Sequence, residues 1–153
     1  MVQLMYGAGL RVSELVNLKK GDLKTDKNYG FVRHGKGNKD RIFIVGESIR
    51  GEIERTAEYL REDDFSFTSI RDKSYSLRSL QMIIKNAAKK AGITKRISCH
   101  TLRHSFATHL IESGSSVSEV QALLGHKSPE TTFVYVHTAG PKMIKTKSPV
   151  DEL

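Results

Sequence analysis

Apolar side chains recur at helical spacing in several separate stretches of this sequence, and this pattern limits the possible fold more than any other feature. Residues three or four positions apart share one face of a helix, so each stretch predicts a helix with one buried side. The stretches are 1–6, 12–18, 47–60, 77–91, 99–114, 117–124 and a last one that runs through Tyr135. The sequence therefore predicts a mainly helical domain.

Residues that start and stop helices support these boundaries. Ser76 is a predicted N-cap and Gly92 a predicted C-cap for the helix between them. The run Ser116-Val117-Ser118-Glu119 has the spacing of a capping box, in which Glu119 reaches back to the amide of Ser116. Ser128-Pro129 offers an N-cap followed by a proline at the first helical position, where the missing amide hydrogen costs nothing.

Two short runs near the N-terminus have strand character instead. Residues 29–33 and 41–45 flank the glycine-rich turn Gly35-Lys36-Gly37-Asn38-Lys39-Asp40, which predicts a β-hairpin with a positively charged tip. The polar connection 61–75 contains a further short strand-like run at 65–67. The predicted fold class is therefore mainly α with a small β-hairpin or sheet, an α+β arrangement.

Size and composition fit one domain in a reducing compartment. The chain has 153 residues, enough to bury a core but short for two domains. Its single cysteine, Cys99, argues against a disulfide framework. Aliphatic and aromatic runs reach only four residues, as at 42–45, which is far too short to span a bilayer. We expect a cytoplasmic protein without a signal peptide or membrane anchor.

The positive charge is concentrated in one segment. Residues 73–111 contain eight lysines and arginines and no acidic residue, whereas the remaining 17 basic and 17 acidic residues cancel, so this segment accounts for the net charge of +8. Such a field attracts polyanions, and nucleic acid is the commonest of them. A lysine-rich helix face in contact with solvent is the competing explanation. Candidate DNA contacts on the predicted helix 77–91 are Arg78, Lys85 and Lys89.

The histidines after position 99 raise two possibilities. His100 and His104 are one helical turn apart and beside Cys99, a spacing that can chelate zinc. The segment has no acidic residue to act in a metalloprotease, and Arg103 would repel a cation, so we predict no metal. A site for phosphate fits better, because the forked guanidinium of Arg103 suits phosphate oxygens and His100 and His126 can donate hydrogen bonds. Taken singly, each histidine could equally be a polar helix cap, and Tyr135 an ordinary core or surface tyrosine.

Four motifs together resemble those of the tyrosine recombinases, also called phage-type integrases, and most closely the Xer-type members, with a tail that is faintly similar to archaeal ones. The motifs occur in the order of that family and extend from residue 1 to about 137. They are Gly7-Ala8-Gly9-Leu10-Arg11-Val12-Ser13-Glu14-Leu15, the hairpin Gly35-Lys36-Gly37-Asn38-Lys39-Asp40-Arg41, His100-Thr101-Leu102-Arg103-His104, and Leu123-Leu124-Gly125-His126 with Tyr135 nine residues after His126.

The resemblance implies a metal-free and ATP-free DNA strand transferase for site-specific recombination. Tyr135 would be the nucleophile that forms a 3′-phosphotyrosine link, and Arg11, Arg103, His100 and His126 would act on the phosphate and on the tyrosine proton. Lys36 would be the general acid for the leaving 5′-oxygen, with Lys39 as a nearby candidate. Lys36 could also only touch phosphate, as Lys39 and Arg41 are predicted to do. Glu14 would orient the site, or be an exposed helix carboxylate.

The same resemblance implies duplex DNA as partner, no cofactor, and self-association as a tetramer on two DNA sites. We expect residues 1–139 to be the catalytic domain without the N-terminal DNA-gripping domain of most members, and 140–153 to be a C-terminal tail exchanged between protomers. Two other functions stay open: a catalytically silent DNA-binding remnant that regulates recombination, and an activity like that of type IB topoisomerases. An SDS-resistant protein–DNA adduct separates the first of these from an active enzyme, and relaxation of plasmid without partner sites identifies the second.

Overall fold

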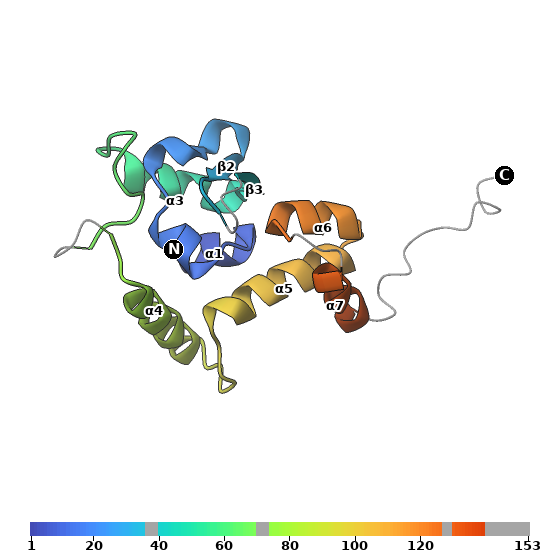
Figure 1. Ribbon diagram of the computed structural model, residues 1–153. Helices are drawn as coiled ribbons and strands as arrows, with labels where there is room; N and C mark the ends of the chain where they lie inside the picture. Colours follow the sequence, from blue (N-terminus) through green and yellow to red (C-terminus); the bar gives the residue numbers. More distant parts are fainter. Residues whose placement is uncertain (36–39, 70–73, 127–129, 140–153) are drawn as a thin grey trace.

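The computed structural model describes residues 1–35, 40–69, 74–126 and 130–139, and of residues 137–139 only the backbone. Within these ranges the chain is mostly helical with a small antiparallel sheet, which confirms the predicted fold class (Figure 1). The helices are α1 (Val2–Ala8), α2 (Val12–Val16), α3 (Glu47–Ala57), α4 (Leu77–Lys90), α5 (Cys99–Glu112), α6 (Val117–Leu124) and α7 (Glu130–Ala139). No helix of the described residues is long and apolar enough to cross a membrane.

The sheet has three strands in the order β1 (Leu23–Lys24), β2 (Tyr29–Val32) and β3 (Arg41–Ile44). Strands β2 and β3 pair antiparallel with Tyr29 opposite Ile44, so the predicted hairpin is present. The two-residue β1 was not predicted; it lies between the 3-10 turns η1 (Lys20–Asp22) and η2 (Thr25–Lys27). The strand-like run at 65–67 contributes only a single bridge, between Phe65 and Lys19.

Two of the predicted helix starts are observed, whereas the C-cap of α4 is Ala91 and not Gly92, and the predicted start at Ser128-Pro129 lies outside the described residues. Ser76 accepts a hydrogen bond from the Ser79 amide at the start of α4, and Ser116 and Glu119 form the predicted capping box of α6. Helix α1 extends beyond the predicted stretch 1–6 through Gly7 and Ala8, and ends at Gly9 with φ of +58°. A left-handed residue at this point is the common way for a helix to stop, and glycine adopts it without a steric penalty.

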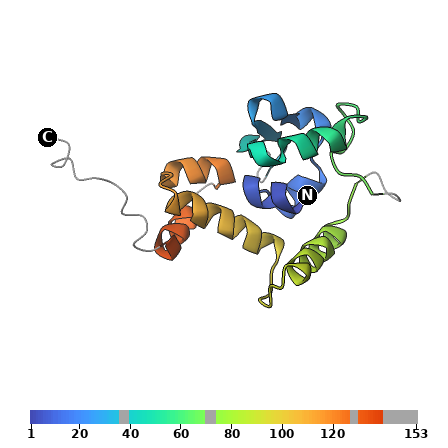
Figure 2. The same cartoon turned by 180° about the vertical axis from the view of Figure 1, so that it is seen from behind.

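Helix α5 connects the two parts of the hydrophobic core. Its first residue, Cys99, belongs to the buried cluster that also contains residues of α1, α2, β3 and α4, and its second half packs with α6 and α7 through Phe106 and Ile111. Figures 1 and 2 show α5 running from the side of α4 to the side of α6 and α7, with α1 alongside it. Residues near the start of α5 are thereby placed between the N-terminal and the C-terminal elements of the chain.

Candidate active site

Arg11 and Glu14 form a clamp at the start of α2. Arg11 has an extended backbone just before the helix, so its amide is free to donate to the Glu14 carboxylate, 2.7 Å from Oε2. Its guanidinium Nη1 donates to Glu14 Oε1, also at 2.7 Å. The side chain of Glu14 is only 5% exposed, whereas that of Arg11 retains 24% of its surface. Glu14 therefore fixes Arg11 from the protein side and leaves part of the guanidinium accessible.

Two more arginines approach the same carboxylate. Arg41 Nη2 lies 2.6 Å from Glu14 Oε2, and Arg103 Nη1 lies 3.9 Å from it. Burial by itself would raise the pKa of Glu14, but the charge of Arg41 and the hydrogen bonds from Arg11 outweigh burial and lower that pKa below its ordinary value of 4.5. Glu14 is thus an ionised carboxylate at neutral pH, surrounded by three guanidinium groups.

Arg103 is the deepest of these groups. Its guanidinium donates from Nη1 to the Gly9 carbonyl at 2.5 Å and from Nη2 to the Leu124 carbonyl at 2.6 Å. Burial, and then repulsion from Arg11, lower its pKa to about 10, so it stays protonated at neutral pH. Three guanidiniums against one carboxylate leave an excess of positive charge, which a bound anion would neutralise.

A cavity of about 400 Å³ opens beside this cluster. Arg11, His100 and Arg103 line it together with Lys85 and Arg96, and within the described part of the chain no aspartate or glutamate belongs to its lining. Three of the predicted catalytic residues thus share one cavity, and Lys85 brings α4 into it. A concave surface whose described charged side chains are all positive favours an anionic group such as a phosphate.

His126 and Tyr135 lie together after the end of α6, whose Leu124 carbonyl Arg103 binds. His126 follows the end of α6, and its Nδ1 lies 3.0 Å from the hydroxyl of Thr132, which is completely buried on α7. The rings of His126 and Tyr135 are stacked, with centroids 6.2 Å apart, and the ring of His104 lies 4.9 Å from Tyr135.

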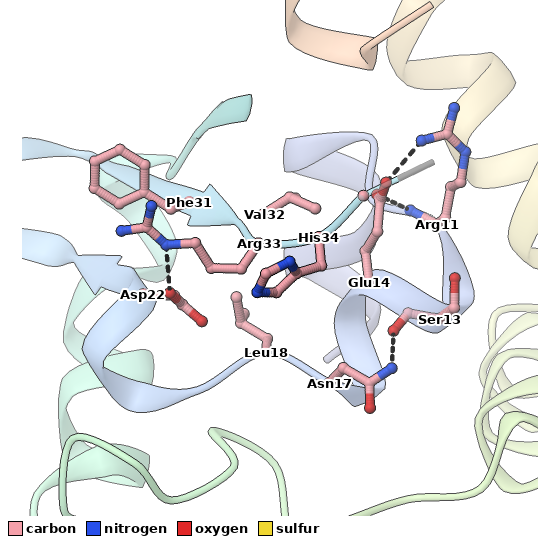
Figure 3. A pocket seen from close by; sticks show the side chains of 11 residues that line it. Arg11, Ser13, Glu14, Asn17, Leu18, Asp22, Phe31, Val32, Arg33 and His34 are labelled. Carbon is pink, nitrogen blue, oxygen red and sulfur yellow. Dashed lines mark hydrogen bonds and ion pairs between the residues drawn. The ribbon is translucent and has the colours of Figure 1, made fainter. Parts of the chain in front are cut away.

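A second cavity, of about 410 Å³, shares Arg11 and Glu14 with this site (Figure 3). Figure 3 shows Arg11 facing Glu14 on one side of it and Arg33 facing Asp22 on the other, with His34 between them. Acidic and basic groups alternate here and are paired with each other. This cavity therefore lacks the one-signed charge of the first.

The remaining predicted residues divide into three groups. Lys36 and Lys39 lie outside the described residues. Arg78 and Lys89 are exposed on α4, away from its buried face, as a contact to a large partner requires. Arg41 was predicted to touch DNA, but its side chain is only 8% exposed and is held by Glu14 and by the Leu123 carbonyl, so in this arrangement its guanidinium faces the protein.

Sequence reasoning missed Thr132 and the carbonyl groups of Gly9 and Leu124, although these atoms orient His126 and Arg103. The Thr131-Thr132 pair, five and six residues after His126, was visible, but nothing local indicated which hydroxyl faces inward. Among the residues that the structure describes, no three histidine, cysteine, aspartate or glutamate side chains come together as metal ligands.

Comparison with known proteins identifies the family of this chain. The sequence matches the model of the phage integrase family over residues 1–140. Curated relatives include the tyrosine recombinase XerD of Listeria monocytogenes serotype 4b (strain F2365), 40% identical over 146 residues covering 90% of this chain and 48% of the relative. The tyrosine recombinase XerA of Thermococcus kodakarensis is 41% identical over 140 residues, covering 88% of this chain and 49% of that protein.

Solved structures agree with the sequence relatives. The crystal structure of XerA recombinase matches with a TM-score of 0.82 and 33% identity, over 92% of this chain and 52% of the other. XerH recombinase bound to palindromic difH substrate, in a post-cleavage complex, matches with a TM-score of 0.79 and 25% identity over 93% of this chain and 42% of that one. The chain spans about half the length of the curated relatives it matches. The predicted resemblance is confirmed: this chain belongs to the phage integrase family, with the Xer-type tyrosine recombinases among its relatives.

Proposed function

We propose that residues 1–139 are the catalytic domain of a site-specific DNA recombinase, which cleaves and rejoins duplex DNA through Tyr135. The proposal rests on family membership and on one observation above the others. The ring of Tyr135 is stacked with that of His126, which follows the Leu124 carbonyl held by Arg103 by two residues, and Arg103 in turn shares a positively charged cavity with Arg11 and His100.

The reaction conserves the energy of the phosphodiester. The phenolic oxygen of Tyr135 attacks the phosphorus, a bond between that oxygen and phosphorus forms, and the bond from phosphorus to the 5′-oxygen breaks. The tyrosine proton passes to a nearby base, and the leaving 5′-oxygen takes up a proton to become a hydroxyl. Reversing both steps on another strand rejoins the DNA, so neither ATP nor a metal ion enters the balance.

The charges in the cavity are suited to the transition state. Negative charge grows on the non-bridging phosphate oxygens, and Arg11 and Arg103 can donate to them from fixed positions. The carbonyls of Gly9 and Leu124 each accept one hydrogen bond from Arg103, which leaves its other N–H groups for the phosphate. His126 would be a further donor, and His100 would receive or share the tyrosine proton.

Lys36 is the proposed general acid for the 5′-oxygen, with Lys39 as the second candidate, on the strength of the hairpin motif. A lysine on a flexible stem suits this role, because it can approach the leaving group from the groove of the DNA. Substitution of each lysine by alanine, measured on DNA whose leaving oxygen is replaced by sulfur, separates them. Sulfur leaves without a proton, so only the variant of the true acid is rescued.

We further propose that duplex DNA lies across α4 and the start of α5, and that the enzyme works as a tetramer on two sites. The free positive side chains of Arg78, Lys85 and Lys89 follow α4, which borders the cavity. Residues 140–153 would dock on a neighbouring protomer. The relative XerH was solved bound to its difH substrate, which supports the choice of duplex DNA.

Covalent capture tests the proposal. The chain is incubated with a pool of nicked duplexes of randomised sequence, in which the strand released by cleavage diffuses away and rejoining is blocked. We expect an SDS-resistant adduct that links a 3′-phosphate to Tyr135, identified by mass spectrometry of the tryptic peptide. Tyr135→Phe should give none, whereas the matched variant of a surface tyrosine, Tyr59→Phe at 91% exposure, should behave like the wild type.

Each result has a definite meaning. DNA binding by the wild type without any adduct would overturn the proposal in favour of a silent DNA-binding module. An adduct accompanied by relaxation of supercoiled plasmid that lacks partner sites would assign the chain a topoisomerase-like activity instead.

A further inference from the structure

Arg41 is a buried cation that faces neither of the two cavities. It begins strand β3, and its guanidinium donates from Nη2 to Glu14 on α2 and from Nη1 to the Leu123 carbonyl at the end of α6. Glu14 and Arg41 are 5% and 8% exposed, so the contact is closed to solvent. One side chain thus joins three elements that are far apart in the sequence.

The end of α6 depends on this contact. The last carbonyl groups of a helix have no partner within it and need one from elsewhere. Arg41 takes the carbonyl of Leu123, and Arg103 takes the next one, of Leu124. Gly125 then turns the chain with φ of +63°, and a Cβ on it would lie only 2.7 Å from Arg41 Cδ. Arg41 therefore binds a carbonyl three residues before His126 and lies beside the turn that immediately precedes this histidine.

His126 has little freedom beyond this turn. Its amide donates to the Gln121 carbonyl at 3.2 Å, the Gln121 side chain donates to its carbonyl at 3.3 Å, and its ring meets Thr132 and Tyr135. The path from Arg41 to the His126 ring is thus a single tight turn. Through Nη2, Arg41 also binds the Glu14 carboxylate, which in turn binds Arg11.

We infer that Arg41 is a positioning residue. It holds His126 at a fixed position relative to the Arg11–Glu14 clamp and does not itself touch DNA. The inference rests on the proposed function for its effect on cleavage, but not for its effect on His126. The competing explanation is an ion pair that only stabilises the fold, and the two differ in what happens to the His126 ring.

Arg41→Met removes both hydrogen bonds while keeping a long apolar stem, and Arg41→Lys keeps the charge. A lysine ammonium lacks the planar, forked guanidinium that binds Glu14 and Leu123 at the same time. The lysine variant should therefore not restore the position of the His126 ring. Arg33→Met is the matched control, because Arg33 lies in the same hairpin, also pairs with carboxylates, and is half exposed.

The first readout needs no reaction. Ring ¹H–¹³C NMR signals of His126 are assigned by their loss in His126→Ala. They should shift or broaden in Arg41→Met and in Arg41→Lys and stay unchanged in Arg33→Met. His126 signals identical to the wild type in a folded Arg41 variant would overturn the inference. Should Arg41→Met not fold, Arg41→Lys alone decides by the same signals.

The second readout is single-turnover cleavage of a captured DNA substrate. We expect the rate in Arg41→Met to fall by ~10-fold or more, as for other residues that orient a catalytic group, with the Kd for DNA nearly unchanged. Combined with His126→Ala, Arg41→Met should add little further loss, because both act through one ring. A double variant whose cleavage rate falls by the product of the two single losses would contradict the inference. So would an Arg41→Met variant in which only the Kd for DNA changes. If the wild type forms no adduct, the proposed function fails while the NMR result still decides the role of Arg41.

Discussion

Replacing Glu14 by glutamine removes the one carboxylate that three guanidinium groups share, with almost no change in shape. The side chains of Arg41 and Arg103 are 8% and 6% exposed, so they cannot regain hydration where they are. Removing one partner of a buried ion pair costs ~3–5 kcal/mol, because the other charge stays buried without compensation. The amide oxygen of glutamine still accepts one hydrogen bond, so we expect a loss of free energy of unfolding near ~3 kcal/mol.

The loss should depend on pH in a direction that the structure fixes. The pKa of Glu14 in the folded protein lies below its ordinary value of 4.5, because Arg41 and the hydrogen bonds of Arg11 outweigh the effect of burial. Above pH 4.5 the carboxylate is ionised in both states and its full stabilisation is present. As the pH falls below 4.5, the unfolded state takes up the proton first, so this stabilisation declines. The difference between wild type and Glu14→Gln should therefore shrink in acid.

Urea unfolding followed by circular dichroism, at pH 7 and at steps below pH 4.5, measures both effects. A loss of ~3 kcal/mol corresponds to a fall in Tm of roughly 6–12 °C for a chain of this size. Glu58→Gln, at an exposed position, is the control and should change stability by less than ~0.5 kcal/mol. A loss under ~1 kcal/mol at pH 7, or one that stays constant in acid, would refute the argument that this carboxylate compensates the buried arginines.

Three further substitutions test other parts of the site. Gly125→Ala should lower the free energy of unfolding by more than ~1 kcal/mol in urea, because alanine is strained at φ of +63° and its Cβ would meet Arg41; an unchanged midpoint would contradict this. Thr132→Val should slow single-turnover cleavage by ~10-fold while leaving the Kd for DNA unchanged, since it removes only the hydrogen bond to His126. Lys85→Ala should weaken DNA binding and reduce its salt dependence by about one released ion in a filter-binding titration; an unchanged salt slope would remove Lys85 from the interface.

Local sequence signals predicted the helices well because their causes are local. Ser76 and Ser116 act on amides three residues away, and Gly9 stops α1 by its own backbone angle. Strand β1 and the bridge from Lys19 to Phe65 were beyond such signals. Their partners are set by how the chain returns on itself, and a two-residue strand carries no periodicity of its own.

The candidate catalytic residues were easier to predict than the contacts that hold them in place. Arg11, His100 and Arg103 were chosen by residue type and motif, and they line one cavity. Arg41 was assigned to DNA because charge can be read from a sequence while burial cannot. The structure instead buries it against Glu14 and a helix end.

That difference has a physical origin in the carbonyl groups that hold the arginines. Backbone oxygens of Gly9, Leu123 and Leu124 accept three of the hydrogen bonds that orient Arg41 and Arg103, and any residue type supplies the same oxygen. Which oxygen is left without a partner depends on where a helix ends and what packs on that end. Arg103, which binds two such oxygens, is thereby fixed before any substrate arrives, and preorganised donors of this kind are what stabilise charge in a transition state. The ends of α1 and α6 are therefore part of the catalytic apparatus that we propose, although no side chain at Gly9, Leu123 or Leu124 takes part in the chemistry.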